Sequence, residues 1–351
     1  MTRTILIALD GSKLAEQVIP VVSAVAASTG SEVVLVSAVV PHDGWTEGPV
    51  AQGWEQEEQG AAASYLRLVR RQLQKPGLKV RAVRVESGHP HAVISAIADE
   101  EAADLIAMTT HGRSGFVRWV VGSVADKVLR TSRRPLLLVH MQKEGEIPEV
   151  RLNRILVPLD GSPLAESVLP FVQDLAVSLH ASILLQSVIV PTATLYAGTL
   201  LPSMAPILTE IEEAMREYLG GVAKRLEHEG IRVETSVAIG YAAETILDAA
   251  KQGSVDLIAL STHGRSGPER SILGSVADAV VRHADRPCLV IPARGSHRVE
   301  EEPEPGEAGA PMAGTSIVPP PALTETPMDQ ERRRDRVPEE RAHRPERSPG
   351  R

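Results

Sequence analysis

Short runs of apolar, often β-branched residues alternate along the chain with longer segments of helical periodicity. This alternation predicts parallel β-strands that are joined by helices packed on both faces of a sheet. Most of the runs are continuously apolar, as is expected of strands covered on both faces. In the first part of the chain, strands are expected at Thr4–Leu9, Glu32–Val39, Val80–Val85, Leu105–Thr109 and Leu136–His140, and helices near Ser12–Ser28, Gln56–Gln74, His91–Glu101 and Ser123–Thr131.

The whole pattern occurs twice. Residues 5–20 and 155–170 are identical at 11 of 16 positions, and residues 104–130 and 256–282 at 18 of 27. The two offsets, 150 and 152, are nearly equal, so an entire domain is duplicated. Five strands per copy predict an open, doubly wound parallel sheet with the Rossmann-like order 3-2-1-4-5. The strands of the second copy are expected at Arg154–Leu159, Ser182–Ile189, Arg232–Ala238, Leu257–Ser261 and Cys288–Pro292.

These repeats predict two similar α/β domains followed by a tail that is rich in Pro, Glu and Arg. The tail lacks the apolar residues that would offset the entropy of ordering it, so disorder is expected there. The expected divisions are a first domain at 1–141, a linker at 142–151, a second domain at 152–293 and the tail at 294–351.

Local signals refine this outline. Ser162 and Pro163 form a helix start with a capping residue and a proline at the first helical position. Pro20 and Pro170 fall inside the first expected helix of each copy, where they should kink it. After the second strand of each copy the sequences diverge, and such long connections tend to be lids or partner surfaces. These segments are 41–55 and 191–206.

Composition and charge exclude several classes of protein. Cys288 is the one cysteine, which rules out a disulfide framework and a multi-cysteine metal site, and indicates a reducing compartment. No signal peptide is visible, and no apolar run approaches the roughly 18 residues of a membrane span. The net charge of −8, with no basic face in either repeat, argues against nucleic-acid binding. We therefore expect a soluble, cytoplasmic protein.

Two motifs follow strands whose carboxyl ends should flank one crevice, the usual ligand site of an open parallel sheet. Asp10–Ser12 and Asp160–Ser162, both with the sequence DGS, follow the first strand of each copy. The glycine-rich segments Thr109–Ser123 and Ser261–Ser275 leave the fourth strand and lead into the last helix. Asp10 has a second interpretation, because Asp before Gly-Ser commonly caps the turn that follows it.

The glycine-rich segments suit phosphate binding. Gly112, Gly115 and Gly122 would let the backbone approach an anion closely, and the helix that begins near Ser123 offers free N–H groups and a favourable dipole. Gly264, Gly267 and Gly274 repeat the arrangement before Ser275 in the second copy. The alternative is that these glycines only form a tight turn and allow close packing of helix on sheet.

The motif THGRSG, the nine residues between Gly112 and Gly122-Ser123, the opening LDGS and the five-strand pattern together resemble the universal stress protein family. The resemblance covers nearly all of both repeats and implies a tandem two-domain member. Nucleotide-binding members of that family carry a further glycine at the positions of Thr109 and Ser261. Thr109 and Ser261 are a departure from that pattern: a side chain beside the ribose would either tighten or obstruct the pocket, or supply a hydroxyl contact. The resemblance as a whole implies ATP as the ligand, with or without Mg²⁺.

The resemblance also implies roles for particular residues. Asp10 and Asp160 would contact adenine or ribose, Ala38 and Val188 would line the adenine, and Met108 and Leu260 would precede the ribose position. The phosphates would be held by Gly112, Arg113, Gly122, Ser123 and Val124, and in the second copy by Gly264, Arg265, Gly274, Ser275 and Val276. Ser261 is smaller than Thr109, and Val188 covers more adenine than Ala38, which favours the second copy.

No catalytic or metal-binding residue is predicted. His111 and His263 have no serine, cysteine or carboxylate partner implied by spacing in both copies, so a structural role is expected for them. His89 and His91 form an HxH pair, but the second copy lacks it, which argues against a metal site. Three functions stay open: a nucleotide-binding stress-response module without turnover, an interaction protein with vestigial pockets, and a slow ATPase.

The fifth strand of each copy should have an unpaired edge at the end of the sheet. A bare apolar edge promotes aggregation, so natural proteins cover it. Single-domain members of the similar family cover it by two-fold pairing between chains. We therefore expect an intrachain pseudo-dimer in which Leu136–His140 faces Cys288–Pro292 across a pseudo-two-fold axis.

Overall fold

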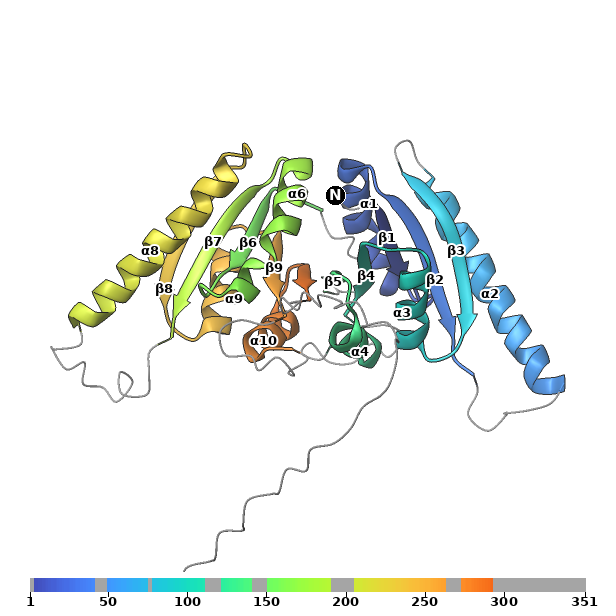
Figure 1. Ribbon diagram of the computed structural model, residues 1–351. Coiled ribbons are helices and arrows are strands. Elements are labelled where there is room, and N and C mark those ends of the chain that lie inside the picture. The colour runs from blue at the N-terminus through green and yellow to red at the C-terminus, as the bar shows by residue number, and fades with distance from the viewer. Residues whose placement is uncertain are drawn as a thin grey trace, which may run out of the picture. The chain divides into compact units, whose positions relative to one another are not determined.

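The computed structural model describes residues 3–41, 49–74, 78–110, 121–140, 150–190, 205–262 and 273–292 (Figure 1). We call residues 3–140 the first half and residues 150–292 the second half. The first half contains β1 (Thr4–Ala8), the 3-10 helix η1 (Ala15–Gln17), α1 (Val18–Thr29), β2 (Glu32–Val39), α2 (Pro49–Leu73), β3 (Lys79–Ser87), α3 (Pro90–Glu100), β4 (Leu105–Thr109), α4 (Ser123–Thr131) and β5 (Leu136–Val139). The second half contains β6 (Arg154–Pro158), α5 (Pro163–Glu166), α6 (Leu169–Leu179), β7 (Ser182–Ile189), α8 (Ala205–Glu227), β8 (Val233–Ile239), α9 (Ala242–Gln252), β9 (Leu257–Ser261), α10 (Ser275–His283) and β10 (Cys288–Ile291).

The described strands form a ten-stranded sheet in the order β3-β2-β1-β4-β5-β10-β9-β6-β7-β8. Within each half the neighbouring strands are parallel, and the predicted order 3-2-1-4-5 is confirmed. The halves meet through β5 and β10, which pair antiparallel with Leu138 opposite Cys288 and Leu136 opposite Val290. The two exposed edges that the sequence predicted therefore cover one another within the chain, as expected.

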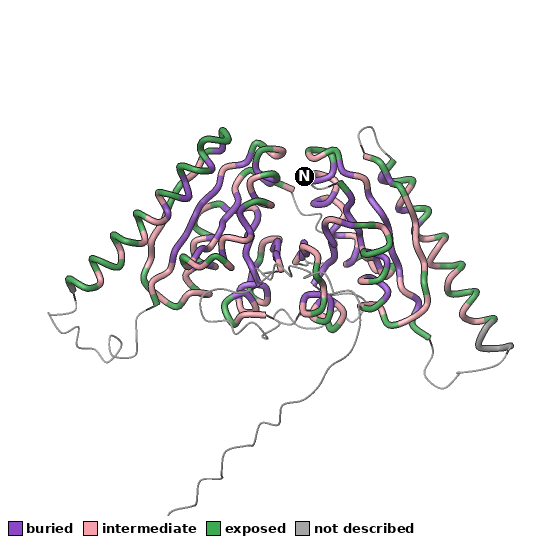
Figure 2. The backbone as a smooth tube through the Cα atoms, in the orientation of Figure 1, coloured by how far each residue is buried: buried purple, intermediate pink, exposed green. Residues whose placement is uncertain are grey.

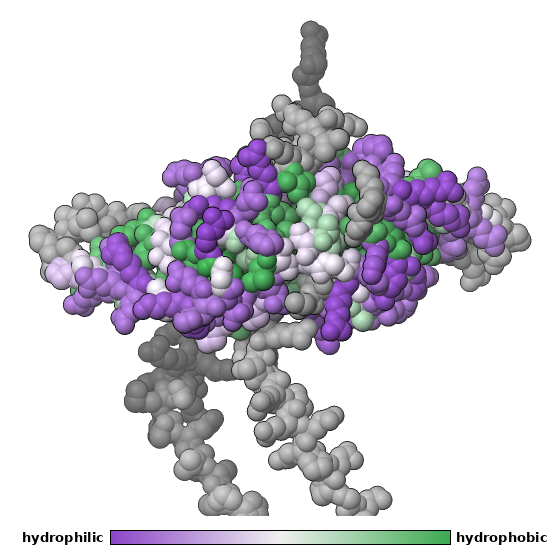
Figure 3. All heavy atoms as spheres, turned by 90° about the horizontal axis from the view of Figure 1, so that it is seen from above, coloured by the Kyte–Doolittle hydropathy of each residue, from purple (hydrophilic) through white to green (hydrophobic). Residues whose placement is uncertain are grey.

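Alternate side chains of the strands enter two hydrophobic cores, one on each face of the sheet. Ile5 and Ile7 pack on the face covered by α1, α2, α6 and α8, whereas Leu6 packs on the face covered by α3, α4, α9 and α10. Figure 2 shows the inner strands buried and much of α2 and α8 exposed. In the view from above, hydrophilic side chains cover most of the visible face, with hydrophobic ones in smaller groups among them (Figure 3).

Pro20 and Pro170 do not kink a continuous helix, contrary to the prediction. Each segment is divided in two: η1 precedes α1, and α5 precedes α6. Both prolines lie in the first turn of the second piece, where a missing N–H group breaks no hydrogen bond inside the helix. The predicted cap at Ser162 is confirmed, because its side chain accepts a hydrogen bond from the Ala165 N–H group.

Four charged side chains join α4 to α10 next to the paired strands. Within each helix an aspartate accepts from the arginine one turn later, Asp126 from Arg130 and Asp278 from Arg282. Across the halves, Arg282 donates to Asp126 at 3.1 Å and Arg130 to Asp278 at 3.4 Å. The result is a closed ring of four ion pairs, which we call the Asp–Arg ring.

A further contact between the halves is one-sided. His140, directly after β5, has its Nδ1 atom 2.9 Å from the carbonyl oxygen of Arg286 and its Nε2 atom 2.6 Å from that of Val281. The corresponding place after β10 is taken by Pro292, which has no donor. The two halves are thus similar in fold but differ in the residues that bind them to each other.

Candidate functional site

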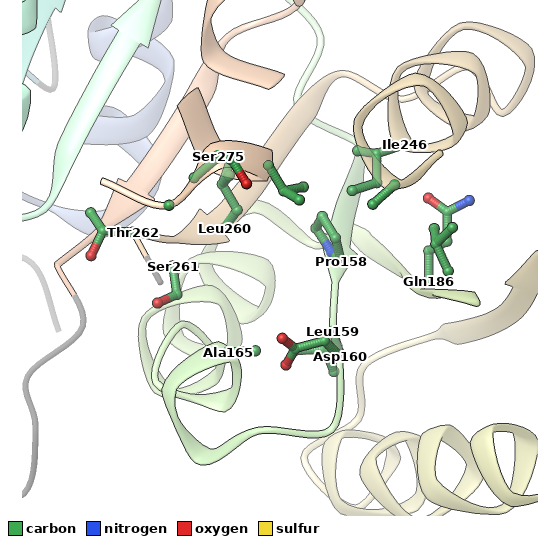
Figure 4. A pocket seen from close by; sticks show the side chains of 15 residues that line it. Pro158, Leu159, Asp160, Ala165, Gln186, Ile246, Leu260, Ser261, Thr262 and Ser275 are labelled. Atoms are coloured by element: carbon green, nitrogen blue, oxygen red, sulfur yellow. The ribbon is translucent and has the colours of Figure 1, made fainter. Parts of the chain in front are cut away.

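A cavity lies in the second half at the carboxyl ends of β6, β7 and β9, in front of the N-terminus of α10 (Figure 4). Its empty volume is about 740 Å³, a figure that includes the solvent at its open side. The residues that line it are Pro158, Leu159, Asp160, Ala165, Gln186, Val188, Ala242, Ile246, Leu260, Ser261, Thr262, Gly274, Ser275, Val276 and Ala277.

The cavity brings together most of the site residues that were predicted for the second copy. Residues from four separate segments meet in one wall, because the carboxyl ends of parallel strands share one edge of the sheet. Those that line it are Asp160, Val188, Leu260, Ser261, Gly274, Ser275 and Val276. The other two, Gly264 and Arg265, lie outside the described residues, as does His263.

The two ends of the cavity differ in polarity. Figure 4 shows Gln186 and Ile246 at one end, with Ser261, Thr262 and Ser275 towards the other. Apolar side chains from β7 and α9 line the first end, whereas hydroxyl groups line the second, where Leu260 lies beside Ser275 at the start of α10. Such a cavity suits a ligand that has a flat apolar part and an anionic part.

The DGS turn holds Asp160 in place. Its Oδ1 atom accepts hydrogen bonds from the backbone N–H group of Ser162 at 3.0 Å and from the Ser162 hydroxyl at 2.7 Å. Gly161 has a φ of 84°, a left-handed conformation that side chains disfavour, so the turn requires glycine. Asp160 therefore does cap the turn, and it lines the cavity at the same time.

The first half repeats this arrangement. Asp10 Oδ1 accepts from the Ser12 N–H group at 2.9 Å and from its hydroxyl at 2.7 Å, and Gly11 has a φ of 86°. The predicted residues Ala38, Met108, Thr109, Gly122, Ser123 and Val124 occupy positions equivalent to those that line the cavity of the second half. Gly112 and Arg113 lie outside the described residues, together with His111.

Backbone hydrogen bonds fix both ends of the glycine-rich segment. The Thr262 N–H group donates to the Ile291 carbonyl at 2.9 Å, and the Gly274 N–H group donates to the Thr262 carbonyl at 2.7 Å. In the first half the Gly122 N–H group donates to the Thr110 carbonyl at 2.5 Å. Each helix that follows thus starts at a fixed point beside the end of its strand.

The N-terminus of α10 faces the cavity. Gly274 is the capping residue and has no side-chain hydrogen bond to the first turn. The first N–H groups of a helix have no partner inside it, and the helix dipole adds a partial positive charge at this end. These groups, on residues that line the cavity, form a suitable place for a phosphate.

Behind the DGS turn, α8 is bound to α5. The Tyr218 hydroxyl donates to Glu166 Oε1 at 3.0 Å, and Arg225 donates to Glu166 Oε2 at 2.7 Å. Burial, followed by the bond to Glu166, raises the pKa of Tyr218 above its usual value. The hydroxyl therefore stays protonated at neutral pH and keeps donating to the short helix beside Asp160.

The sequence analysis missed several residues of the cavity. Ala242 and Ile246 come from α9, and Thr262 follows β9. Gln186 was missed as well, although a polar side chain within the apolar run SILLQSVI was a signal that could have identified it.

Two further predictions concern metal and membrane. Within the described ranges, no group of three or more His, Cys, Asp or Glu side chains is placed to hold a metal ion. None of the helices in those ranges combines the length and apolar character needed to cross a bilayer.

Comparison with known proteins identifies relatives. The model of the universal stress protein family matches residues 1–140 and again 151–292. A universal stress protein of Methanocaldococcus jannaschii is 29% identical over 140 residues, which are 40% of this chain and 81% of that protein. One from Mycobacterium bovis is 26% identical over 195 residues, 54% of this chain and 61% of that protein. The match thus spans less than two thirds of the mycobacterial relative.

Solved structures share the fold. A universal stress protein from Archaeoglobus fulgidus covers 84% of this chain with its whole length, at 20% identity and a TM-score of 0.61. A protein from Pseudomonas aeruginosa covers 83% of this chain with 93% of its own length, at 17% identity and a TM-score of 0.61. The domain boundaries 1–141, 142–151, 152–293 and 294–351 stay predictions.

Proposed function

The chain belongs to the universal stress protein family as a tandem two-domain member, and from this premise we propose that it binds ATP or a related adenine nucleotide. The proposed role is that of a regulatory module in the stress response, without turnover of a metabolite. Mg²⁺ could accompany the phosphates as part of the ligand. We also propose a cytoplasmic location, supported by the one cysteine, Cys288, which is buried and free.

The observation that carries the proposal is the polarity of the cavity in the second half. Val188 and Ile246 offer an apolar slot for a base, and Leu260 and Asp160 line the cavity further along. The hydroxyl groups of Ser261 and Ser275 and the start of α10 lie where the ribose and phosphates of such a ligand would extend. The equivalent residues of the first half support a second site of the same kind.

Isothermal titration calorimetry of the full chain with ATP tests the proposal. Gly274→Val places a branched side chain at the capping position of α10 and should abolish binding in the second half, and Gly122→Val should do so in the first. Gly220→Ala is the matched control, because Gly220 lies on α8 with nothing within 4 Å of an added Cβ atom. If the Gly122→Val, Gly274→Val double variant binds ATP with unchanged affinity, the proposal is wrong.

The proposal includes an absence of catalysis. Phosphate binding lowers the barrier to hydrolysis only where it favours the transition state, and the predicted site residues supply no positioned pair of base and metal. We expect no multiple turnovers of ATP by the pure protein. Turnover that is lost on substituting His111 and His263 would contradict this and favour an ATPase.

The interaction hypothesis depends on other segments. Residues 42–48 of the first segment, residues 191–204 of the second and all of the tail lie outside the described residues. Protein partners bound through these segments therefore stay a sequence-based prediction. We propose no second function from them.

A further inference from the structure

Gln186 is a buried polar side chain inside an otherwise apolar part of the cavity. It lies on β7, on the same face as Leu184 and Val188, and only 2% of its surface is exposed. Its Oε1 atom has no hydrogen-bond partner in the part of the chain that the structure describes. A buried carbonyl oxygen without a donor destabilises the protein, so a residue in this state needs an explanation.

The fold itself does not require an amide at this position. The equivalent residue of β2 in the first half is Val36, which is completely buried. The backbone is the same in both halves: Leu159 donates to the Gln186 carbonyl at 2.8 Å, and Leu9 donates to the Val36 carbonyl at 2.9 Å. A valine packs at the equivalent point of the equivalent strand, so the fold does not need a polar group there. The amide of Gln186 is specific to the second half.

The side-chain amide of Gln186 lies at one end of the cavity. Gln186 lines it together with Pro158, its register partner on β6, and with Val188 further along the strand. Ala242 and Ile246 of α9 close the same end, and Figure 4 shows the amide beside Ile246. A ligand group that reaches this end meets apolar side chains and, among the described side chains there, the amide of Gln186 as a polar partner.

We propose that Gln186 recognises the polar edge of an adenine-type base, through a hydrogen bond from the base's exocyclic amino group to Oε1. In protein–DNA complexes, a glutamine amide pairs with adenine through this amino group and the neighbouring ring nitrogen. The amide offers an acceptor and a donor side by side, which matches that edge. The inference rests on the proposed function and makes Gln186 a specificity-determining residue of the second half alone.

The test compares ATP with purine ribonucleoside triphosphate, which lacks the exocyclic amino group, by calorimetry on the full chain. Gly122→Val serves as the background, so that only the second half is measured. We expect ATP to bind about tenfold more tightly than the purine analogue, the usual size of such base discrimination. Gln186→Met, nearly the same shape without hydrogen-bonding atoms, should weaken ATP binding by the same factor and leave the analogue unaffected.

Two further variants test whether the effect is specific to the Gln186 amide. Gln186→Asn keeps the amide but shortens the side chain by one methylene, so it should also lose the preference for ATP. Ser236→Ala changes the register partner of Gln186 on β8, which does not line the cavity, and should keep the preference. Thermal unfolding shows that each variant is folded; without ligand, Gln186→Met should melt no lower than the parent, because it removes a buried unpaired oxygen.

The outcomes separate the two proposals. If ATP binds but its preference over the analogue persists in Gln186→Met and Gln186→Asn, the role of Gln186 is refuted and the nucleotide site stands. If neither nucleotide binds to the protein without substitutions, the proposed function fails and this inference fails with it. A preference that both variants lose and Ser236→Ala retains supports the assignment.

Discussion

Substitution of Asp126 by Asn tests whether the Asp–Arg ring holds the two halves together. The variant keeps the shape of the side chain but removes the charge that Arg130 and Arg282 share. The four side chains are 27–35% exposed, so water screens the ring only in part. A pair one turn apart contributes about 0.3–0.5 kcal/mol, and a partly exposed pair between elements about 0.2–1 kcal/mol.

We therefore expect Asp126→Asn to lower the free energy of unfolding by about 1 kcal/mol. Differential scanning calorimetry would record this as a decrease of about 2–4 °C in the melting temperature for domains of this size. In 1 M NaCl the Debye length is only about 3 Å, so the decrease should at least halve. Asp99→Asn is the control, because Asp99 pairs with Arg134 inside one half and is 74% exposed; it should change the melting temperature less.

The pH dependence gives an independent check. Hydrogen bonds from Arg130, with a contribution from Arg282, hold the pKa of the Asp126 carboxyl below its usual value. A carboxyl whose folded pKa is lowered stabilises the protein fully above its unfolded pKa, about 3.9, and loses that effect as the pH falls through the folded pKa. The difference between the parent protein and Asp126→Asn should thus be constant above about pH 5 and vanish at lower pH. An equal difference at every pH and salt concentration would refute the reasoning.

Three more predictions concern the second half and its contact with the first. Ser162→Ala removes the cap of α5 and should cost about 1 kcal/mol in urea unfolding, whereas Ser178→Ala, on the exposed side of α6, should cost less. Leu138→Ala should cost about 2–5 kcal/mol, because Leu138 is fully buried where β5 meets β10; a smaller loss would mean that this contact is loosely packed. Burial raises the pKa of the Cys288 thiol well above its usual value, so a thiol reagent at neutral pH should label it only after unfolding, and rapid labelling of the native protein would contradict the buried placement.

Much of the fold is predictable from local sequence because the strands are continuous apolar runs. The observed bounds of β2, β4, β7 and β9 are those that the sequence predicts. The sequence does not predict the start of α2 at Pro49, because the residues before Gln56 show no clear helical period. The predicted kink at Pro20 was also wrong, because a local pattern does not reveal that a 3-10 helix ends at Gln17 and an α-helix begins at Val18.

The candidate site is predictable to a similar degree and for a related reason. Asp160, Ser261 and Gly274 follow or precede strands and helices whose ends must meet at one edge of the sheet. Gln186 lies within a mostly apolar strand, where a polar residue is easily read as an exception to the pattern. The Asp–Arg ring includes the pair Arg130–Asp278, whose members are 148 residues apart in sequence, and a local pattern cannot reveal such a contact.

The contacts that the Asp–Arg ring makes between the halves are reciprocal. Arg130 of the first half pairs with Asp278 of the second, and their counterparts, Arg282 and Asp126, pair in the same way. This is the geometry of an isologous dimer, here enclosed within one polypeptide. Two separate copies would have to find each other, and their association would weaken on dilution; the tethered pair meets at a fixed effective concentration. Two identical subunits would also have to carry the same residue at every position. A single chain is released from that constraint, and Val36 and Gln186 at equivalent points of β2 and β7 are an instance of this freedom.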